Sequence, residues 1–287
     1  MSISLTPGPD ELEHYQGNNS PACCNIYSDM DEKIEPERKT FMADSSDFRV
    51  LQGGDSCIII DFGEQISMEL NNKVHNLNTW IGKKRYPGLI ETVPTYRSLA
   101  VYFEPGKFDL QYFTGDIESL EPAILDAELP EKKVIHIPVS YGNEFGPDLL
   151  ELAEYHGLTP DKVITIHSSP TYHCYMIGFT PGFPYLGGLD ERLATPRLLE
   201  PRNLIPSGSV GIAGNQTGIY PIESPGGWRI IGRTPLKLFD PSAHPPVMIR
   251  SGWSIRFYPV PAVQYEEIMR MVISGRYVPE ITGSEDL

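Results

Sequence analysis

The sequence predicts an α+β protein in which a small helix-and-sheet domain precedes a larger domain built mainly of short β-strands. Between residues 48 and 125 the hydrophobic pattern gives the order strand, strand, helix, strand, strand, helix. This order is typical of helices that cover one face of an antiparallel sheet. From Gly178 to Pro235 the chain is dense in Gly and Pro, yet apolar and aromatic residues are interleaved through it. A disordered segment lacks such apolar mass, so many short strands joined by turns, in a closed or sandwiched β structure, are predicted there.

The first 46 residues are expected to form a disordered acidic tail. They are rich in polar residues, Pro and Gly, and show no sustained hydrophobic period. Residues 1–47 carry ten acidic side chains against three basic ones. Such a segment serves either as a solvated extension or as a regulatory or partner-binding region, and the sequence leaves both readings open.

The small α+β domain is expected over residues 47–132. Two apolar runs, Phe48–Leu51 and Cys57–Phe62, flank a Gly-Gly-Asp turn and predict a hairpin. An amphipathic pattern predicts a helix over 67–84, because its apolar residues recur at spacings of three and four. Two more strands and a weaker second helix follow, at Leu89–Val93, Ser98–Phe103 and 110–125.

The larger domain is expected over residues 133–275, with a frayed segment at 276–287. It opens with a strand, and two helices follow, the second with Thr159 as N-cap and Pro160 at its first position. A buried strand leads into the Gly/Pro-dense stretch, and three strand-like runs and a final helix come after it. These elements are predicted at Lys133–Tyr141, 148–157, 160–169, Thr171–Phe179, 236–240, 247–252, 254–260 and 261–275.

Composition excludes several classes of function. The net charge of −15, with no basic stripe, argues against nucleic-acid binding. No apolar run is long enough to cross a membrane, and the N-terminus lacks a signal-peptide pattern. The four Cys have no metal-ligand spacing, so we expect thiols of a reducing, cytoplasmic compartment and no intrinsic metal site.

Familiar catalytic motifs are absent from the Gly-rich stretch. Gly208–Gly214 has neither the dinucleotide-binding spacing nor the Lys-Ser/Thr ending of a phosphate-binding loop, although a phosphate cradle there is not excluded. Ser207 and Ser209 lie outside any G-x-S-x-G elbow, which argues against a self-contained serine hydrolase.

His167 is the titratable residue of most interest. It lies at the end of a predicted helix, where the helix dipole favours a protonated imidazole. Alternatively, it points into a cleft as an acid, base or substrate hydrogen bonder.

Several polar and aromatic residues of the Gly/Pro-dense stretch predict a groove that binds an anionic small molecule. Arg is suited to bidentate recognition of carboxylate or phosphate, whereas a single Arg more often forms a surface ion pair. Trp228 packs against the preceding turn or forms an aromatic wall for a ligand. The groove is predicted from Arg197, Arg202, Arg229, Arg233, Tyr185, Gln216, Thr217, Tyr220, Pro225, Gly226, Gly227 and Trp228.

Six segments in and just after this stretch are distinctive: GFTPGFPYLGGLD, ATPR, EPR, IPSGSVGIAGNQTGIYP, SPGGWRIIGRTP and LFDP. They resemble the carboxyltransferase C/D-subdomain family, which includes the B-type subunit of 5-oxoprolinase (PxpB), KipI, allophanate hydrolase subunit 1 and a segment of urea carboxylase. The resemblance is dense over about Pro138–Pro259 and covers roughly residues 48–275, with a thinner match through VPTYRSLAVYFEP in the first domain. One departure is the strand segment Tyr172-His173-Cys174-Tyr175, where the family usually has Tyr-Arg-Val-Tyr.

The resemblance implies a fold, a function and partners. The first domain would be a small ferredoxin-like α+β unit and the second a cyclophilin-like β-barrel. The chain would be the B-type subunit of a heteromeric, ATP-dependent 5-oxoprolinase that opens 5-oxo-L-proline to L-glutamate. It would work with a C-type carboxyltransferase partner and an A-type protein, and ATP, with Mg, would be shared with these partners.

The resemblance also implies residue roles and alternatives. His167 would be an acid/base or substrate hydrogen bonder, Arg197, Arg202 and Arg233 anion clamps, and the remaining groove residues orienting groups for the substrate. One alternative is a KipI-like inhibitor of a histidine kinase, which uses the barrel surface for binding. Another is a component of a urea-type carboxyltransferase.

Overall fold

The computed structural model describes residues 41–44, 47–127 and 133–283. Three buried hydrophobic clusters organise them: one drawn from residues 48–125, one from residues 135–268, and a smaller aromatic one from residues 183–230. The rest of the predicted acidic tail, residues 1–40 and 45–46, lies outside the described residues. Strand β1 (Phe41–Asp44) falls inside the predicted tail, where it pairs with β2, so the tail prediction does not hold for these four residues.

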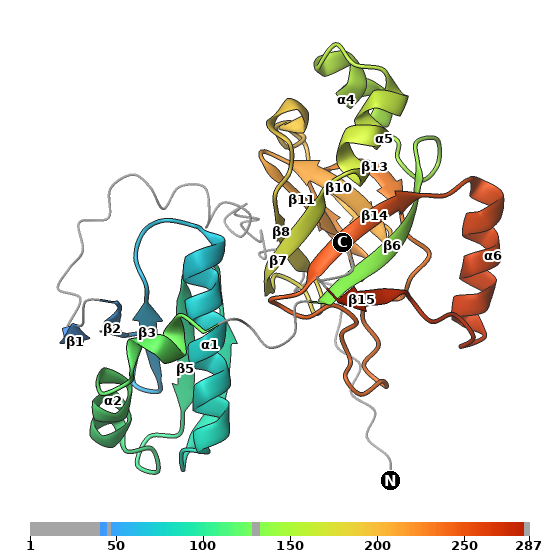
Figure 1. The fold of residues 1–287 in the computed structure, drawn as a ribbon. Helices are drawn as coiled ribbons and strands as arrows, with labels where there is room; N and C mark the ends of the chain where they lie inside the picture. Colours follow the sequence, from blue (N-terminus) through green and yellow to red (C-terminus); the bar gives the residue numbers. More distant parts are fainter. Residues whose placement is uncertain (1–40, 45–46, 128–132, 284–287) are drawn as a thin grey trace, which may run out of the picture. The chain divides into compact units, whose positions relative to one another are not determined.

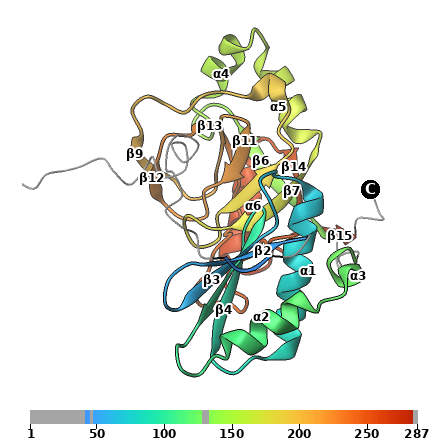
Figure 2. The same cartoon turned by 90° about the vertical axis from the view of Figure 1, so that its left-hand side faces the viewer.

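The part of the chain before β6, called the first domain below, is an antiparallel sheet with helices on one face (Figure 2). Its strand order is β1-β2-β3-β5-β4, so β5 lies between β3 and β4, which helix α1 connects. The predicted hairpin, the first helix and the next two strands are confirmed. Their bounds are β2 Arg49–Gln52, β3 Cys57–Asp61, α1 Met68–Lys84, β4 Leu89–Pro94 and β5 Ser98–Phe103.

The second predicted helix of this domain is broken in two. Helix α2 (Leu110–Glu118) begins at Asp109, whose side chain accepts a hydrogen bond from the Tyr112 amide. Helix α3 (Pro122–Leu125) follows after a short break. Because the residue before a proline is pushed into an extended conformation, Glu121 cannot continue the first helix into Pro122.

From β6 onward the chain forms a closed barrel of seven strands (Figure 1), which fits the cyclophilin-like barrel expected from the motifs. The strand order is β13-β10-β11-β8-β7-β14-β6, and β6 pairs with β13 to close the barrel. Among the described strands, β6 and β14 form the one parallel pair. The bounds are β6 Lys133–Tyr141, β7 Thr171–Ile177, β8 Pro184–Gly187, β10 Ser209–Ala213, β11 Gln216–Ile219, β13 Arg229–Arg233 and β14 Ser254–Pro259.

Smaller elements surround the barrel. Figure 1 shows α4 and α5 at one end of the barrel and α6 along its side. Thr159 caps α5 as predicted, because its side chain accepts from the Lys162 amide. A separate pair of strands, β9 and β12, lies within the Gly/Pro-dense stretch. The bounds are α4 Leu149–Tyr155, α5 Pro160–Ser168, a 3₁₀ turn Glu191–Leu193, β9 Arg202–Ile205, β12 Ser224–Gly226 and α6 Ala262–Ile273.

The predicted strands at 236–240 and 247–252 are wrong. Only one isolated bridge, between Phe239 and Val247, joins the two runs. The intervening DPSAHPP segment lacks three backbone N–H donors at its prolines, which prevents a regular ladder. The C-terminal segment departs from its prediction too. Strand β15 (Ile281–Gly283) pairs with the first residues of β6. The last residues of β6 pair with β13 along the same edge. Residues 281–283 therefore lie in a strand and are not frayed.

Candidate functional site

His167 lies in the last turn of α5 and is sealed inside the barrel. Its side chain is fully buried, and its ring stacks on Phe257 with centroids 4.8 Å apart. Its Nδ1 accepts from the Tyr141 hydroxyl at 2.8 Å, and its Nε2 lies 2.9 Å from Thr217 Oγ1. The Thr217 hydroxyl donates to the Gly211 carbonyl at 3.0 Å, so it accepts from His167 and fixes the Nε2–H tautomer.

Burial also fixes the charge of this ring. Desolvation lowers the pKa of His167 to about 3, so the imidazole is neutral at pH 7. The helix-dipole interpretation, which needs a protonated ring, is therefore wrong. A role as acid, base or substrate hydrogen bonder needs a ring nitrogen that a substrate can reach. Both ring nitrogens of His167 are hydrogen-bonded to neighbouring side chains inside the core, so neither is accessible. Of the predicted site residues, the structure brings His167 together with Thr217.

Arg202 links β9 to the start of α4 through an ion pair. Its guanidinium binds both carboxylate oxygens of Asp148, at 2.9 and 2.6 Å. Asp148 is almost fully buried and also accepts from the Ile230 amide at 2.6 Å. The Arg202 guanidinium is therefore used in an internal ion pair. The anion that it binds is the Asp148 carboxylate of the same chain, so it is not free to bind the carboxylate or phosphate of a ligand.

The remaining arginines do not converge on one cleft. Arg229 forms an ion pair with Glu151 at 2.6 Å. Arg197 is exposed in the loop before β9. Arg233 lies at the other end of β13 from Arg229, and its buried Nε has no hydrogen-bond partner among the described residues.

Trp228 belongs to a buried aromatic cluster. Its ring centroid lies 5.5 Å from that of Phe183 and 6.2 Å from that of Tyr220. A Cβ added at Gly226 would collide with the Tyr220 hydroxyl oxygen, so the chain can pass the phenol there only as glycine. These contacts favour the packing interpretation of Trp228. Gly227 is half-buried and Pro225 exposed beside this cluster.

Tyr185 and Gln216 meet in a half-buried group with Tyr96 of the first domain. The Gln216 Nε2 donates to the Tyr96 hydroxyl at 2.9 Å. The Tyr96 ring lies 5.2 Å from Tyr175 and 6.0 Å from Tyr185, centroid to centroid. Burial raises the pKa of Tyr96, so its phenol stays protonated and neutral. Sequence reasoning missed Tyr96 as a site residue, although it lies in the VPTYRSLAVYFEP segment that resembles the family.

A polar hub joins α1 to β7. The buried Asn71 side chain donates to the carbonyls of Thr95, Tyr96 and Tyr175 at 3.0 to 3.2 Å. Its Oδ1 accepts from His173 Nε2 at 2.9 Å. Burial lowers the pKa of His173 to about 4, with a contribution from the neighbouring His75. The departure from the family strand pattern at this position is thus a neutral histidine inside a hydrogen-bonded hub.

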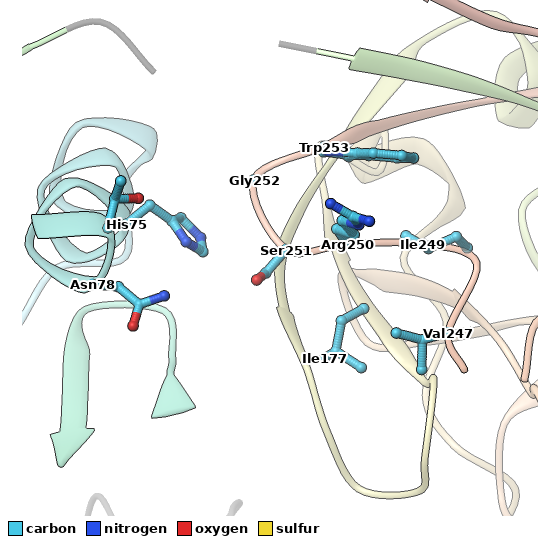
Figure 3. Close-up of a pocket in the computed structure, with 10 residues that line it drawn as sticks. His75, Asn78, Ile177, Val247, Ile249, Arg250, Ser251, Gly252 and Trp253 are labelled. Atoms are coloured by element: carbon cyan, nitrogen blue, oxygen red, sulfur yellow. The ribbon is translucent and has the colours of Figure 1, made fainter. Parts of the chain in front are cut away.

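An open pocket of about 580 Å³ lies beside this hub, between α1 and the loop that precedes β14 (Figure 3). The sequence does not predict this pocket, because the run 247–252 has the composition of a strand. The helix contributes polar groups, and the loop adds a cation and an aromatic ring. The lining residues are His75, Asn78, Thr79, Ile177, Val247, Ile249, Arg250, Ser251, Gly252 and Trp253.

Two absences can be stated for the described part of the chain. It contains no group of three or more His, Cys, Asp or Glu residues placed to hold a metal ion. It also contains no helix that is both long and apolar enough to span a membrane.

Comparison with known proteins gives the family. The model of the carboxyltransferase domain, subdomain C and D, matches residues 48–249. The chain is 43% identical over 228 residues to the 5-oxoprolinase B-type subunit of Bacillus subtilis, a match that covers 76% of this chain and 95% of that protein. It is 39% identical to the 5-oxoprolinase B-type subunit of Escherichia coli O157:H7, covering 72% of this chain and 93% of that one.

A solved structure supports the fold. The crystal structure of the Kluyveromyces lactis urea carboxylase matches with a TM-score of 0.65 at 19% identity. The match covers 88% of this chain and 26% of that chain, so the two share a fold over about a quarter of the longer protein. The match to the family model covers more than half of the chain, and the chain belongs to the family of carboxyltransferase domains with subdomains C and D.

Proposed function

We propose that this chain is the B-type subunit of an ATP-dependent 5-oxoprolinase, which opens 5-oxo-L-proline to L-glutamate together with partner subunits. The observation that carries the proposal is the 43% identity to the 5-oxoprolinase B-type subunit of Bacillus subtilis across 95% of that protein. The aligned region spans nearly the whole of that subunit and not a single motif of it.

The proposed assembly contains a C-type carboxyltransferase partner and an A-type protein. The described residues form one barrel, and we propose that a C-type partner supplies the related second one. We also infer that the first domain is a ferredoxin-like variant, since β3, α1 and β4 form a split β-α-β unit around β5. In this variant β2, which precedes the unit in sequence, pairs with β3, and β1 lies outside β2 at the edge of the sheet. Together with a domain division at residues 47–132 and 133–275 and a cytoplasmic location, these remain proposals.

The ATP site is proposed to lie outside the Gly208–Gly214 segment. Residues Ser209–Ala213 form strand β10, which pairs with β11 on one side and β13 on the other. Its backbone N–H groups are therefore used in the barrel and cannot cradle phosphates in the way of a glycine-rich loop. We propose that partner subunits hold ATP and its Mg²⁺, and that ATP supplies activation of the lactam carbonyl, a poor electrophile.

Residues at the boundary of the two domains are the best candidates for substrate contact. Gln216 donates to Tyr96, which leaves its amide oxygen without a hydrogen-bond partner among the described residues. Tyr185 lies half-buried beside it. We propose that this group orients the substrate, whereas His167 and Arg202 act as positioning residues that fix the barrel wall through Thr217 and Asp148.

Reconstitution tests the proposed function. The purified chain is combined with A-type and C-type partner subunits, and glutamate release from 5-oxo-L-proline is followed with and without ATP. The expected result is release that requires all three proteins and ATP. A combination of correctly assembled subunits that releases no glutamate would overturn the proposal.

A further inference from the structure

The pocket between α1 and the loop before β14 presents hydrogen-bond donors and one cation without a balancing carboxylate. None of the ten residues that line it is acidic, although the chain as a whole carries a net charge of −15. Figure 3 shows Asn78 and His75 on the helix side, facing Ser251 and Arg250 on the loop side. A concave site lined in this way favours a negatively charged ligand.

The cation of the pocket is available to a ligand. Arg250 is exposed, and its guanidinium lies over the Trp253 ring, 5.6 Å from the ring centroid. It forms no ion pair with another described residue. The Trp253 ring holds the planar guanidinium in place through a cation–π contact, which leaves its N–H edge free to bind a carboxylate.

The helix side supplies a directed donor. The Asn78 Oδ1 accepts from the Thr92 hydroxyl at 2.5 Å, which fixes the orientation of the amide. The Asn78 Nδ2 then points toward the loop side of the pocket (Figure 3). His75 donates through Nε2 to the Tyr175 carbonyl at 3.4 Å, so its Nδ1 remains as an acceptor.

The side of the pocket that faces α1 also carries apolar residues. Ile177 and Val247 are half-buried and Ile249 is buried, and all three line the cavity. A fully hydrated inorganic anion gains nothing from such a surface, whereas the hydrocarbon part of an organic anion does. The Lys133 ammonium also lies over the Trp253 ring, 5.6 Å from its centroid, and adds positive charge beside Arg250. Positive charge beside an apolar wall therefore favours an organic anion over an inorganic one.

We propose that this pocket binds a small organic carboxylate, whose carboxylate group contacts Arg250 and the Asn78 amide while its carbon skeleton lies against Ile177 and Val247. The proposal stands apart from the proposed reaction, since it concerns binding to this chain alone.

Direct binding to the full chain tests the proposal. The probes are acetate, L-glutamate and 5-oxo-L-proline, with acetamide as the uncharged match of acetate. Binding is followed by NMR at the Trp253 indole N–H, assigned with a Trp253→Phe variant, and by calorimetry. At least one carboxylate should shift the Trp253 signal, and acetamide should not. If no carboxylate shifts it, or if acetamide binds as well as acetate, the proposal is wrong.

Two variants and one control locate the binding. Arg250→Gln removes the charge-assisted hydrogen bonds and should weaken binding about tenfold or more. Ser251→Asp places a like charge in the pocket and should abolish binding. The control Arg270→Gln removes an exposed arginine on α6 and should leave binding unchanged. Thermal unfolding checks that each variant is folded, and wild-type affinity in both pocket variants would overturn the proposal.

Discussion

Two histidine-centred clusters, one inside the barrel and one at the boundary between the first domain and the barrel, differ in what their hydrogen bonds serve. Around His167 both ring nitrogens are bound to protein hydroxyls, and the ring is enclosed by Phe257 and Tyr172. At the boundary, His173 and Asn71 bind each other, while the neighbouring His75 lines an open pocket. A closed hydrogen-bond network stabilises one conformation, whereas groups left open beside a cavity can serve a ligand.

The largest expected effect comes from opening the barrel cluster. His167→Ala removes the partner of the Tyr141 hydroxyl and leaves a cavity beside Phe257, so it should lower the free energy of unfolding by about 4 kcal/mol. His167→Phe keeps the stacked ring and should cost about half as much, because only the hydrogen bonds are lost. Urea unfolding of the purified chain measures both.

This pair of variants also decides the role of His167. If His167 has a structural role only, the folded fraction of His167→Phe, assembled with its partners, should retain activity within about tenfold of the wild-type activity. A variant with unchanged stability and activity reduced more than a thousandfold would show that the ring meets the substrate.

Lowering the pH should destabilise both clusters together. Burial depresses the pKa of His167 to about 3 and that of His173 to about 4, below the value of about 6.5 in the unfolded chain. As the pH falls below 6.5, these histidines bind protons in the unfolded chain but not in the folded chain, so the free energy of unfolding decreases. From pH 7 to pH 5 each histidine should contribute a loss of about 2 kcal/mol.

A variant separates the two contributions to this pH dependence. His173→Gln retains a side-chain donor for Asn71 but does not titrate, so the loss of stability between pH 7 and pH 5 should shrink by about 2 kcal/mol. Urea unfolding at a series of pH values measures the slope. An unchanged slope in His173→Gln would mean that His173 is protonated in the folded protein, contrary to its buried position.

The sequence predicted the fold well where the local pattern and the tertiary packing agree. The α1 amphipathic period, the Thr159 cap and the alternation of turns with short strands each have a local cause, and each is found in the structure. The runs at 236–240 and 247–252 have strand-like composition, but the prolines between them prevent a ladder.

Site residues were harder to predict because residue type does not reveal the partner. The family resemblance predicts Arg202 as an anion clamp for a ligand, yet its guanidinium binds Asp148, 54 positions earlier in the chain. The boundary pocket combines His75, Asn78 and Thr79 of α1 with a loop at residues 247–253, and no short motif marks such a distant pair. Tyr96 could have been found from the family resemblance of its segment, whereas nothing in the local pattern pointed to Arg250.

The smallest expected effect on stability comes from Gln216, at the open boundary. Gln216→Leu removes the hydrogen bond to the Tyr96 hydroxyl, and both side chains are half-buried, so water can replace the lost donor. The free energy of unfolding should fall by less than about 1 kcal/mol. If Gln216 orients the substrate, the assembled enzyme should nevertheless show a KM for 5-oxo-L-proline raised about tenfold or more.

The matched change at the sealed cluster is Thr217→Val, which should show the reverse. It should cause a larger loss of stability and little change in the KM of the folded enzyme, because Thr217 contacts His167 and not the open boundary. Equal effects of the two variants on both measurements would remove the distinction between a sealed cluster and an open one.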